Sequence, residues 1–160
     1  MDTHVQRMHR ILFVCYGNMC RSPTAHFVFQ HMVDERGLSD LFHIDSAGEG
    51  YNIDGMSMSH GTIDELVAHK IPFNDNRLSR QFEPYDYELF DHIIAMDNEN
   101  VESLREQTHD DPDRKISLLL SFTGEDREID DPYYTGKYAK AFHEIHRGCE
   151  ALLEKLLSED

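Results

Sequence analysis

The feature that most constrains this chain is a continuous apolar run, Ile11–Cys15 (ILFVC), followed by one loop and then by Ser22 and Pro23. An apolar run without polar alternation is typical of a strand that is buried on both faces of a parallel sheet. Ser at a helix N-cap with Pro at the first helical position signals the start of a helix. We therefore expect a buried strand, a short loop, and a helix that is capped by Ser22 and ends at Gly37.

The rest of the chain repeats this order of strand and helix. Further strands are expected at 42–47, 92–96 and 115–120, and further helices around 63–67, from Asp97 or Asn98 to 104, and at about 138–157, with a polar loop at 121–131. Parallel strands joined by helices require right-handed crossovers. The pattern predicts the α/β class: a single-domain, doubly wound, four-stranded parallel sheet with helices on both faces. Its ligand site should lie beyond the carboxyl ends of the strands, at the loop after the first strand.

Length, charge and cysteine content exclude several classes of protein. A chain of 160 residues fits one domain, and 15 Lys and Arg against 31 Asp and Glu give a net charge of −16. This surplus repels nucleic acid and anionic lipid, so neither is an expected partner. No stretch reaches the roughly 18 to 20 apolar residues of a membrane span, and we expect no signal sequence, because the apolar run after Arg10 is short. Three cysteines are too few for a disulfide scaffold, so we expect a reducing compartment and a cytoplasmic protein. We also expect a monomer.

The loop after the first strand carries the candidate chemistry. Five residues separate Cys15 from Arg21, which is enough for a loop to curl around one tetrahedral anion at a helix N-terminus. Arg21 adds a fixed charge and a planar fork that holds two phosphate oxygens. Helix N-termini and nearby cations lower a cysteine pKa from about 8.5 to roughly 3.5–7.5, so the same loop favours a thiolate at Cys15. The predicted phosphate-binding residues are Tyr16, Gly17, Asn18, Met19, Cys20, Arg21 and Ser22.

This loop resembles the C-x5-R-[ST] loop of the low-molecular-weight protein tyrosine phosphatases, including the Pro23 that follows it. A distant second match, Asp131-Pro132-Tyr133-Tyr134, is similar to the family's Asp-Pro segment before the last helix. Segments 93–97 and 45–48 resemble the family's strand ends, and the likeness covers about residues 10–157 of one domain spanning 1–160. The resemblance implies hydrolysis of phosphotyrosine through a phosphocysteine on Cys15, without a metal or other cofactor, and with Asp131 as the general acid.

Chemical reasoning supports the role of Asp131 independently. A phenolate leaving group needs a proton while Cys15 attacks, and a carboxylic acid across the pocket can supply it. The resulting carboxylate can then activate water to hydrolyse the thiophosphate. The expected partners are tyrosine-phosphorylated proteins or small aryl phosphates.

Aromatic side chains are expected to form the substrate pocket, because a phosphotyrosine ring needs flat apolar walls. The candidates are Tyr16, Tyr51, Tyr133 and Tyr134. Tyr16 departs from the small aliphatic residue expected after the nucleophile.

The predicted support of the loop is formed by Asn18, Ser22 and Ser46. Arg77 stands where relatives often have a His that takes part in this support. Because of this departure, the sequence alone does not predict which side chains contact Asn18.

Two further cysteines require an interpretation. Cys20 can form a small disulfide with Cys15 that protects the nucleophile from irreversible oxidation, or it can simply pack the loop. Cys149 lies on the apolar face of the last helix and is expected in the core. His143 and His146 are helical neighbours without a cysteine pair at zinc spacing, so no metal site is expected.

Two alternatives remain beside the phosphatase. A thioredoxin-coupled arsenate reductase resembles the same family in its first loop but uses two further cysteines in the middle of the chain, and none occurs between Cys20 and Cys149. A non-catalytic phosphopeptide-binding module would need the loop but not Asp131. The presence of Asp131 with Cys15 and Arg21 favours the enzyme.

Overall fold

Four parallel strands form the centre of the computed structural model, which describes residues 8–159. They are β1 (His9–Cys15), β2 (Phe42–Gly48), β3 (His92–Ala95) and β4 (Ile116–Leu118), in the order β2-β1-β3-β4. The order reverses at β1, because β2 pairs on one side of it and β3 on the other. The loop after β1 therefore opens at the switch point of the sheet, where α/β folds bind ligands.

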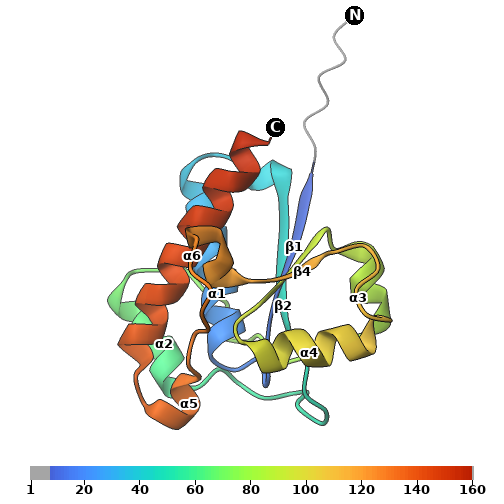
Figure 1. Ribbon diagram of the computed structural model, residues 1–160. Helices are drawn as coiled ribbons and strands as arrows, with labels where there is room; N and C mark the ends of the chain where they lie inside the picture. The colour runs from blue at the N-terminus through green and yellow to red at the C-terminus, as the bar shows by residue number, and fades with distance from the viewer. Residues whose placement is uncertain (1–7, 160) are drawn as a thin grey trace, which may run out of the picture.

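Helices cover both faces of the sheet (Figure 1). On one side lie α1 (Arg21–Glu35), α2 (His60–Ala68) and α6 (Tyr138–Ser158), and on the other lie α3 (Pro84–Leu89) and α4 (Asn98–Gln107). Shorter elements are the 3-10 helices η1 (Ser39–Leu41) and η2 (Leu119–Thr123) and the helix α5 (Pro132–Thr135). The predicted fold class is confirmed. None of the helices in the described part of the chain has the length and apolarity that a membrane span requires.

Alternation along β1 divides the core into two parts. Ile11 and Phe13 are fully buried among residues of α1 and α6, whereas Leu12 and Val14 are fully buried beside α3 and α4. Successive side chains of a strand point to opposite faces, and both faces are covered here. This is why the run is apolar throughout, and it holds β1 rigidly beneath the loop that follows Cys15.

The start of α1 differs from the prediction. The first helical residue is Arg21 and the N-cap is Cys20, which makes no side-chain capping hydrogen bond. Ser22 lies two residues beyond the N-cap, and its hydroxyl contacts Cys15 and Asn18 instead. The serine that signals a helix start in the sequence therefore makes its side-chain contacts within the loop and does not cap the helix.

Other elements also differ from the prediction. The predicted strand 115–120 ends at Leu118, because local hydrogen bonds from Ser121 Oγ to Leu118 O and from Thr123 Oγ1 to Leu120 O support the 3-10 helix η2. Helix α3 was not expected; Pro84 occupies its first turn, and Asp86 completes a capping box with Glu83. The alternative caps of α4 are resolved in favour of Asp97, whose carboxylate accepts from Asn100 N.

Candidate active site

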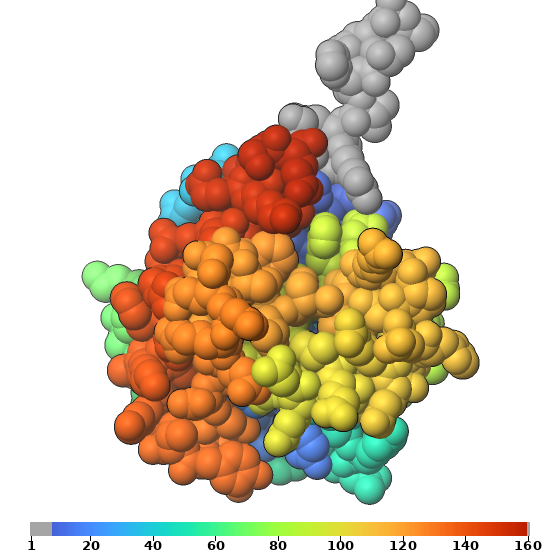
Figure 2. Space-filling view, in the orientation of Figure 1, coloured from blue at the N-terminus to red at the C-terminus, as the bar shows by residue number. Residues whose placement is uncertain are grey.

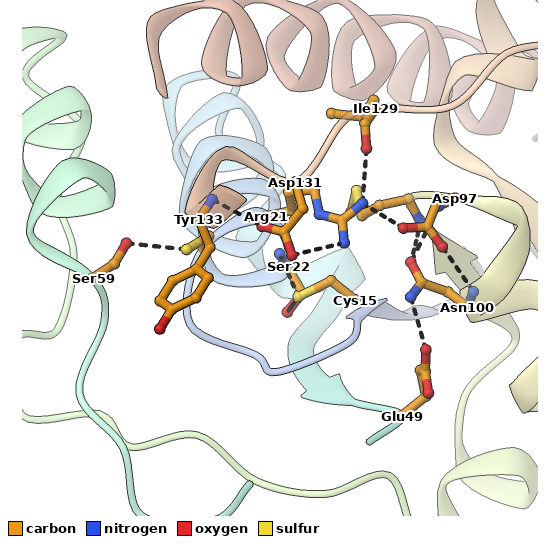
Figure 3. Close-up of polar contacts among 12 residues, drawn as sticks. Cys15, Arg21, Ser22, Glu49, Ser59, Asp97, Asn100, Ile129, Asp131 and Tyr133 are labelled. Atoms are coloured by element: carbon orange, nitrogen blue, oxygen red, sulfur yellow. Dashed lines mark hydrogen bonds and ion pairs between the residues drawn. The ribbon is translucent and has the colours of Figure 1, made fainter. Parts of the chain in front are cut away.

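The Cys15–Ser22 loop joins the carboxyl end of β1 to the N-terminus of α1 (Figure 3). Asn18 lies in its middle with a φ of 58°, in the left-handed region that Asn tolerates better than most residues. Gly48, at the end of β2, allows the loop to lie close by, since a Cβ there would be 2.6 Å from Tyr16 O. The predicted phosphate-binding residues thus form one tight curve at the edge of the sheet.

The sulfur of Cys15 is held by Ser22. The thiol is 3% exposed, its Sγ lies 3.0 Å from Ser22 Oγ, and the Ser22 N–H donates to it at 3.4 Å. Asn18 Nδ2 donates to the same Ser22 oxygen at 2.8 Å, which leaves the hydroxyl proton of Ser22 free to point at the sulfur. Amide and hydroxyl donors at a helix N-terminus form the kind of environment in which a nucleophilic thiolate is stabilised.

Arg21, the first residue of α1, is buried, with 2% of its surface exposed. Its Nη1 donates to Asp97 Oδ2 and to Ile129 O, both at 2.7 Å, and its Nη2 lies 3.5 Å from Asp131 Oδ2. Burial lowers the pKa of Arg21, but the opposing charges of Cys15 and Asp97 outweigh this effect, so its pKa is raised. Arg21 is therefore a permanent cation in a fixed orientation.

The Nε donor of Arg21 remains unused. Its Nε is buried and has no hydrogen-bond partner within residues 8–159. An unsatisfied buried donor costs about 1–3 kcal/mol, more when it is charged. An oxygen of a bound phosphate would remove this cost, so the geometry favours an anion as the ligand.

The three acids of the segment before α5 lie in different environments. Asp131 caps α5 by accepting from Tyr133 N at 3.1 Å and turns its other oxygen toward Arg21. Asp130 is 66% exposed and lies 3.6 Å from Lys140 Nζ. Glu128 accepts from the backbone N–H of Asn98 at 2.7 Å. Of these three acids, Asp131 is the one that faces the nucleophile's side of the cleft.

The predicted loop support is brought together in the structure. Asn18 is fully buried, and its Nδ2 donates to Ser22 Oγ at 2.8 Å and to Ser46 Oγ at 3.0 Å. The Oδ1 of Asn18 accepts from Arg77 Nη2 at 2.6 Å and from Arg80 N at 3.0 Å. Arg77 thus reaches the loop, and Arg80 is a supporting residue that the sequence did not reveal.

An apolar cleft of about 180 Å³ opens above the sulfur. Tyr133 and Tyr134 stack edge to face with ring centroids 5.1 Å apart, and Tyr134 is 80% exposed. Tyr16 lies against Gly50, where a Cβ would come within 2.8 Å of its ring. The residues that line the cleft are Cys15, Tyr16, Gly17, Met19, Cys20, Ile53, Asp131, Tyr133 and Tyr134.

Tyr51 is the expected pocket residue that the structure does not bring to this cleft. It is 67% exposed, and Ile53 lines the cleft from the same segment. Asn52, between these two residues, has a φ of 59° in the left-handed region, so the chain turns there and Ile53 lines the cleft in place of Tyr51.

A second, acidic cleft of about 310 Å³ adjoins the first. The two clefts share Tyr16, Asp131 and Tyr134 as walls. The segment around residues 125–135 and helix α4 flank this region, and in Figure 2 atoms of the N-terminal part of the chain are visible between them near the bottom. The other lining residues are Arg21, Asp97, Glu99, Asn100, Glu128, Ile129 and Asp130.

A chain of contacts behind Arg21 involves residues that the sequence analysis did not assign to the site. Asp97 Oδ1 accepts from Asn100 N at 2.8 Å, and Asn100 Nδ2 donates to the buried Glu49 at 2.9 Å (Figure 3). Burial raises the pKa of Glu49. Asp97 follows shortly after the buried strand β3, a position that places a side chain at the ligand edge of the sheet. The sequence therefore contained a signal that could have assigned Asp97 to the site.

The other cysteines are separate from the nucleophile's hydrogen bonds. Cys20 Sγ lies 3.1 Å from Ser59 Oγ, and burial raises the pKa of Cys20. Cys149 is fully buried in α6, as predicted, and burial raises its pKa as well. Cys15, Cys20 and Cys149 are all free thiols in the structure.

The fold and site together define a class of protein. A thiol at the N-terminus of a helix, a buried guanidinium with an unpaired donor and a facing carboxylic acid are the parts of a cysteine-dependent phosphatase. The family model of low molecular weight phosphotyrosine protein phosphatases matches residues 10–160. The chain belongs to this family.

Individual relatives agree with this assignment. The chain is 38% identical to low molecular weight protein-tyrosine-phosphatase YfkJ of Bacillus subtilis, over 95% of this chain and 98% of that one. It is 35% identical to PtpA of Staphylococcus epidermidis, over 95% and 96%. The crystal structure of YfkJ superimposes with a TM-score of 0.91 over 96% and 97% of the two chains, at 39% identity. The low molecular weight protein tyrosine phosphatase of Streptococcus pyogenes gives 0.84 over 93% of each, at 33%. The predicted family and its enzyme class are confirmed.

Proposed function

We propose that this chain hydrolyses phosphotyrosine monoesters through a phosphocysteine on Cys15, with Arg21 binding the phosphate and Asp131 acting as general acid and then as base. The observation that carries the proposal is the placement of three groups: Cys15 and Asp131 line one cleft, and the buried Arg21 contacts Asp131. Each group has the chemistry that its step requires.

In the first step the thiolate of Cys15 attacks phosphorus. The S–P bond forms as the bond from phosphorus to the phenolic oxygen breaks, and Asp131 transfers its proton to that oxygen. Arg21 donates to the phosphate oxygens, and the positive end of the α1 dipole lies at the same place. The dianion is thereby neutralised without a metal ion.

In the second step water replaces sulfur on phosphorus. Asp131, now a carboxylate, takes a proton from the water as the new P–O bond forms and the S–P bond breaks. Inorganic phosphate leaves, and Cys15 returns as a thiolate that Ser22 can stabilise through its hydroxyl and backbone N–H. One carboxyl group thus serves both half-reactions.

The apolar cleft supports an aryl substrate. Tyr133, Tyr134 and Tyr16 offer aromatic surface around an entrance whose floor is Cys15, and such walls favour the flat ring of a tyrosine phosphate over a short alkyl phosphate. We therefore assign tyrosine-phosphorylated proteins and small aryl phosphates as substrates.

Hydrolysis of an aryl phosphate by the wild type and by Cys15→Ser tests the function. We expect turnover in the wild type and none in Cys15→Ser, although the variant still binds inorganic phosphate. Equal turnover in both proteins would reject the mechanism. Phosphate binding without turnover in the wild type would favour the binding module, and arsenate reduction coupled to thioredoxin would favour the reductase.

We also propose that the protein acts as a monomer in the cytoplasm. The three cysteines are free thiols, and one of them is the proposed nucleophile. Thiols stay reduced in a reducing compartment such as the cytoplasm. Light scattering during size-exclusion chromatography tests the oligomeric state, and a mass of two chains would contradict it.

A further inference from the structure

Glu49 connects the nucleophile's strand to the N-terminus of α4. It directly follows β2, and its backbone N–H donates to the carbonyl oxygen of Cys15 at 2.9 Å. Glu49 is buried, with 5% of the residue exposed, and its Oε2 accepts from Asn100 Nδ2 on α4 at 2.9 Å. These two contacts join the end of β1 to a helix that follows β3, the neighbour of β1 on the side away from β2.

The amide of Asn100 has partners at both of its polar atoms. Its Oδ1 accepts from the backbone N–H groups of Met96 at 3.2 Å and of Asp97 at 3.1 Å, so its Nδ2 faces Glu49. Asn100 is 1% exposed, and a buried amide donor without an acceptor is costly. Glu49 therefore keeps Asn100 in the orientation in which the amide oxygen holds the backbone of residues 96 and 97.

Asn100 and Asp97 together form the capping box of α4. Asp97 Oδ1 accepts from Asn100 N at 2.8 Å, while the side chain of Asn100 accepts from Asp97 N. If the amide turned by 180°, it would present to these N–H groups a nitrogen that cannot accept, and the contact with Glu49 excludes that arrangement. The Oδ2 of Asp97 accepts from Arg21 Nη1 at 2.7 Å, so the same cap fixes the carboxylate that pairs with Arg21.

The position of Asp97 determines which donors of Arg21 remain for a ligand. Nη1 is occupied by Asp97 and by Ile129 O, both at 2.7 Å, whereas the buried Nε has no partner within residues 8–159. Because the guanidinium is planar, a fixed Nη1 also fixes the direction of Nε. A continuous series of contacts therefore runs from Glu49 through Asn100 and Asp97 to the phosphate-binding group (Figure 3).

The charge of Glu49 does not explain its place in this series. Burial raises the pKa of its carboxyl, and the charges of Asp97 and Glu99 raise it further. Hydrogen bonds from Asn100 and Ser103 oppose these effects without cancelling them. A negative charge at Glu49 is thus unfavourable beside its acidic neighbours and beside a bound phosphate. The site needs an oxygen that accepts from Asn100, and a carboxyl group supplies one in either protonation state.

We propose that Glu49 is a positioning residue of the active site, which acts through Asn100 and Asp97 to hold the Arg21 guanidinium in its phosphate-binding orientation. The inference rests on the proposed role of Arg21 in binding phosphate. It assigns a role to a buried acid that takes no part in the proposed reaction steps.

Two substitutions separate the hydrogen bond of Glu49 from its charge. Glu49→Met keeps a side chain of similar size and removes both accepting oxygens, whereas Glu49→Gln removes the charge and keeps one of them. Glu102→Met is the control, because it makes the same change at an exposed position of α4. For each protein we would measure the Kd of inorganic phosphate by calorimetry, kcat/KM with an aryl phosphate, and the melting temperature.

In Glu49→Met we expect the Kd of phosphate to rise about fivefold, which is the net effect of one hydrogen bond. The value of kcat/KM should fall by at least that factor, since Arg21 also holds the phosphoryl group in the transition state. Glu49→Gln should restore the Kd to within about twofold of wild type.

Two results would overturn the inference. One is a Kd in Glu49→Met equal to that of Glu102→Met, even with a lower melting temperature, because Glu49 would then contribute only to stability. The other is a Kd in Glu49→Gln as high as in Glu49→Met, because an accepting oxygen would then be without effect.

A double substitution shows whether Glu49 acts through Asp97. Asp97→Asn already removes the charged partner of Arg21, so the addition of Glu49→Met should raise the Kd further by less than about twofold. An increase of about fivefold in both backgrounds would show independent effects and contradict the series of contacts. If Glu49→Met does not fold, Glu49→Ala takes its place with the same expectations.

Failure of the proposed function gives a different result. A wild type that binds phosphate without hydrolysing aryl phosphates would reject the reaction, whereas the Kd values would still show whether Glu49 acts on Arg21. Normal phosphate binding in every Glu49 variant, with turnover intact, would reject the inference alone.

Discussion

Asp131 Oδ2 lies 3.5 Å from Arg21 Nη2, while the neighbouring Asp130 turns away and pairs with Lys140. The two acids are adjacent in the sequence but have different surroundings, because Asp131 caps α5 through its first oxygen. The cap fixes the carboxyl group at the wall of the cleft. This relationship decides which acid can protonate a leaving group held above Cys15.

The first prediction compares these two acids. Asp131→Asn should lower kcat for an aryl phosphate by about 10²–10⁴-fold, since the phenolate then leaves without a proton. Asp130→Asn should leave kcat within about twofold, because its exposed ion pair contributes little. Steady-state kinetics with leaving groups of different basicity check this, and the loss in Asp131→Asn should grow with basicity. A large loss in Asp130→Asn alone would show that the acids had been assigned in the wrong order.

The second prediction concerns Asp97, which accepts from Arg21 Nη1 at 2.7 Å and caps α4. Asn caps a helix as well as Asp does, so Asp97→Asn removes the charged partner of Arg21 and keeps the cap. We expect the inhibition constant of inorganic phosphate to rise about tenfold or more, because hydrogen bonds to charged groups contribute roughly 1.5–3 kcal/mol. The melting temperature should change less than in Asp97→Ala, which loses both contacts. Unchanged phosphate binding in Asp97→Asn would rule out this role.

Short-range patterns made much of this molecule predictable. The unbroken apolar run of β1 and the periodic apolar face of α6 each specify burial through neighbours in the sequence, and both lie where they were expected. The Cys15–Ser22 loop follows from the apolar run of β1 and from the helix-start signal at Ser22 and Pro23. The strand end and the helix start confine the five residues between Cys15 and Arg21 to one curve. The helix start itself was misplaced, since the signal from Ser22 does not tell a cap from a residue that contacts Cys15.

Long-range contacts explain what the sequence could not show. Arg80 reaches Asn18 across 62 positions, and Asn100 reaches Glu49 across 51. No local pattern marks such pairs, because they depend on which loops meet at the edge of the folded sheet. Tyr51 illustrates the same limit, since the path of its loop decides that Ile53 lines the cleft instead.

The third prediction tests the redox hypothesis for Cys20. Peroxide oxidises Cys15 to a sulfenic acid with release of water, and attack by Cys20 forms the disulfide and releases a second water. Cys20 now contacts Ser59, and burial raises its pKa, so it must leave that contact before it can react. After peroxide treatment, a thiol reductant should restore activity in the wild type. In Cys20→Ser further peroxide carries the unprotected sulfenic acid of Cys15 to the sulfinic acid, which a thiol does not reduce, so activity should not return. Equal recovery in both proteins would leave Cys20 as a packing residue.

The fourth prediction concerns residues that flank the phosphotyrosine. Glu99, Glu128 and Asp130 line the cleft beside the aryl site, and the whole chain has a net charge of −16. Acidic flanks should therefore be repelled, whereas basic flanks should raise kcat/KM severalfold, and the difference should shrink as salt screens it. A phosphopeptide panel at two ionic strengths measures this. A preference for acidic flanks would contradict the expectation.

The most direct measurement is rapid denaturing quench of the wild type mixed with a radiolabelled aryl phosphate, followed by location of the label. One phosphoryl group should appear on Cys15 within the first turnover and should be absent from Cys15→Ser. Continued turnover with no label at Cys15, or the same label in both proteins, would contradict covalent catalysis by this thiol.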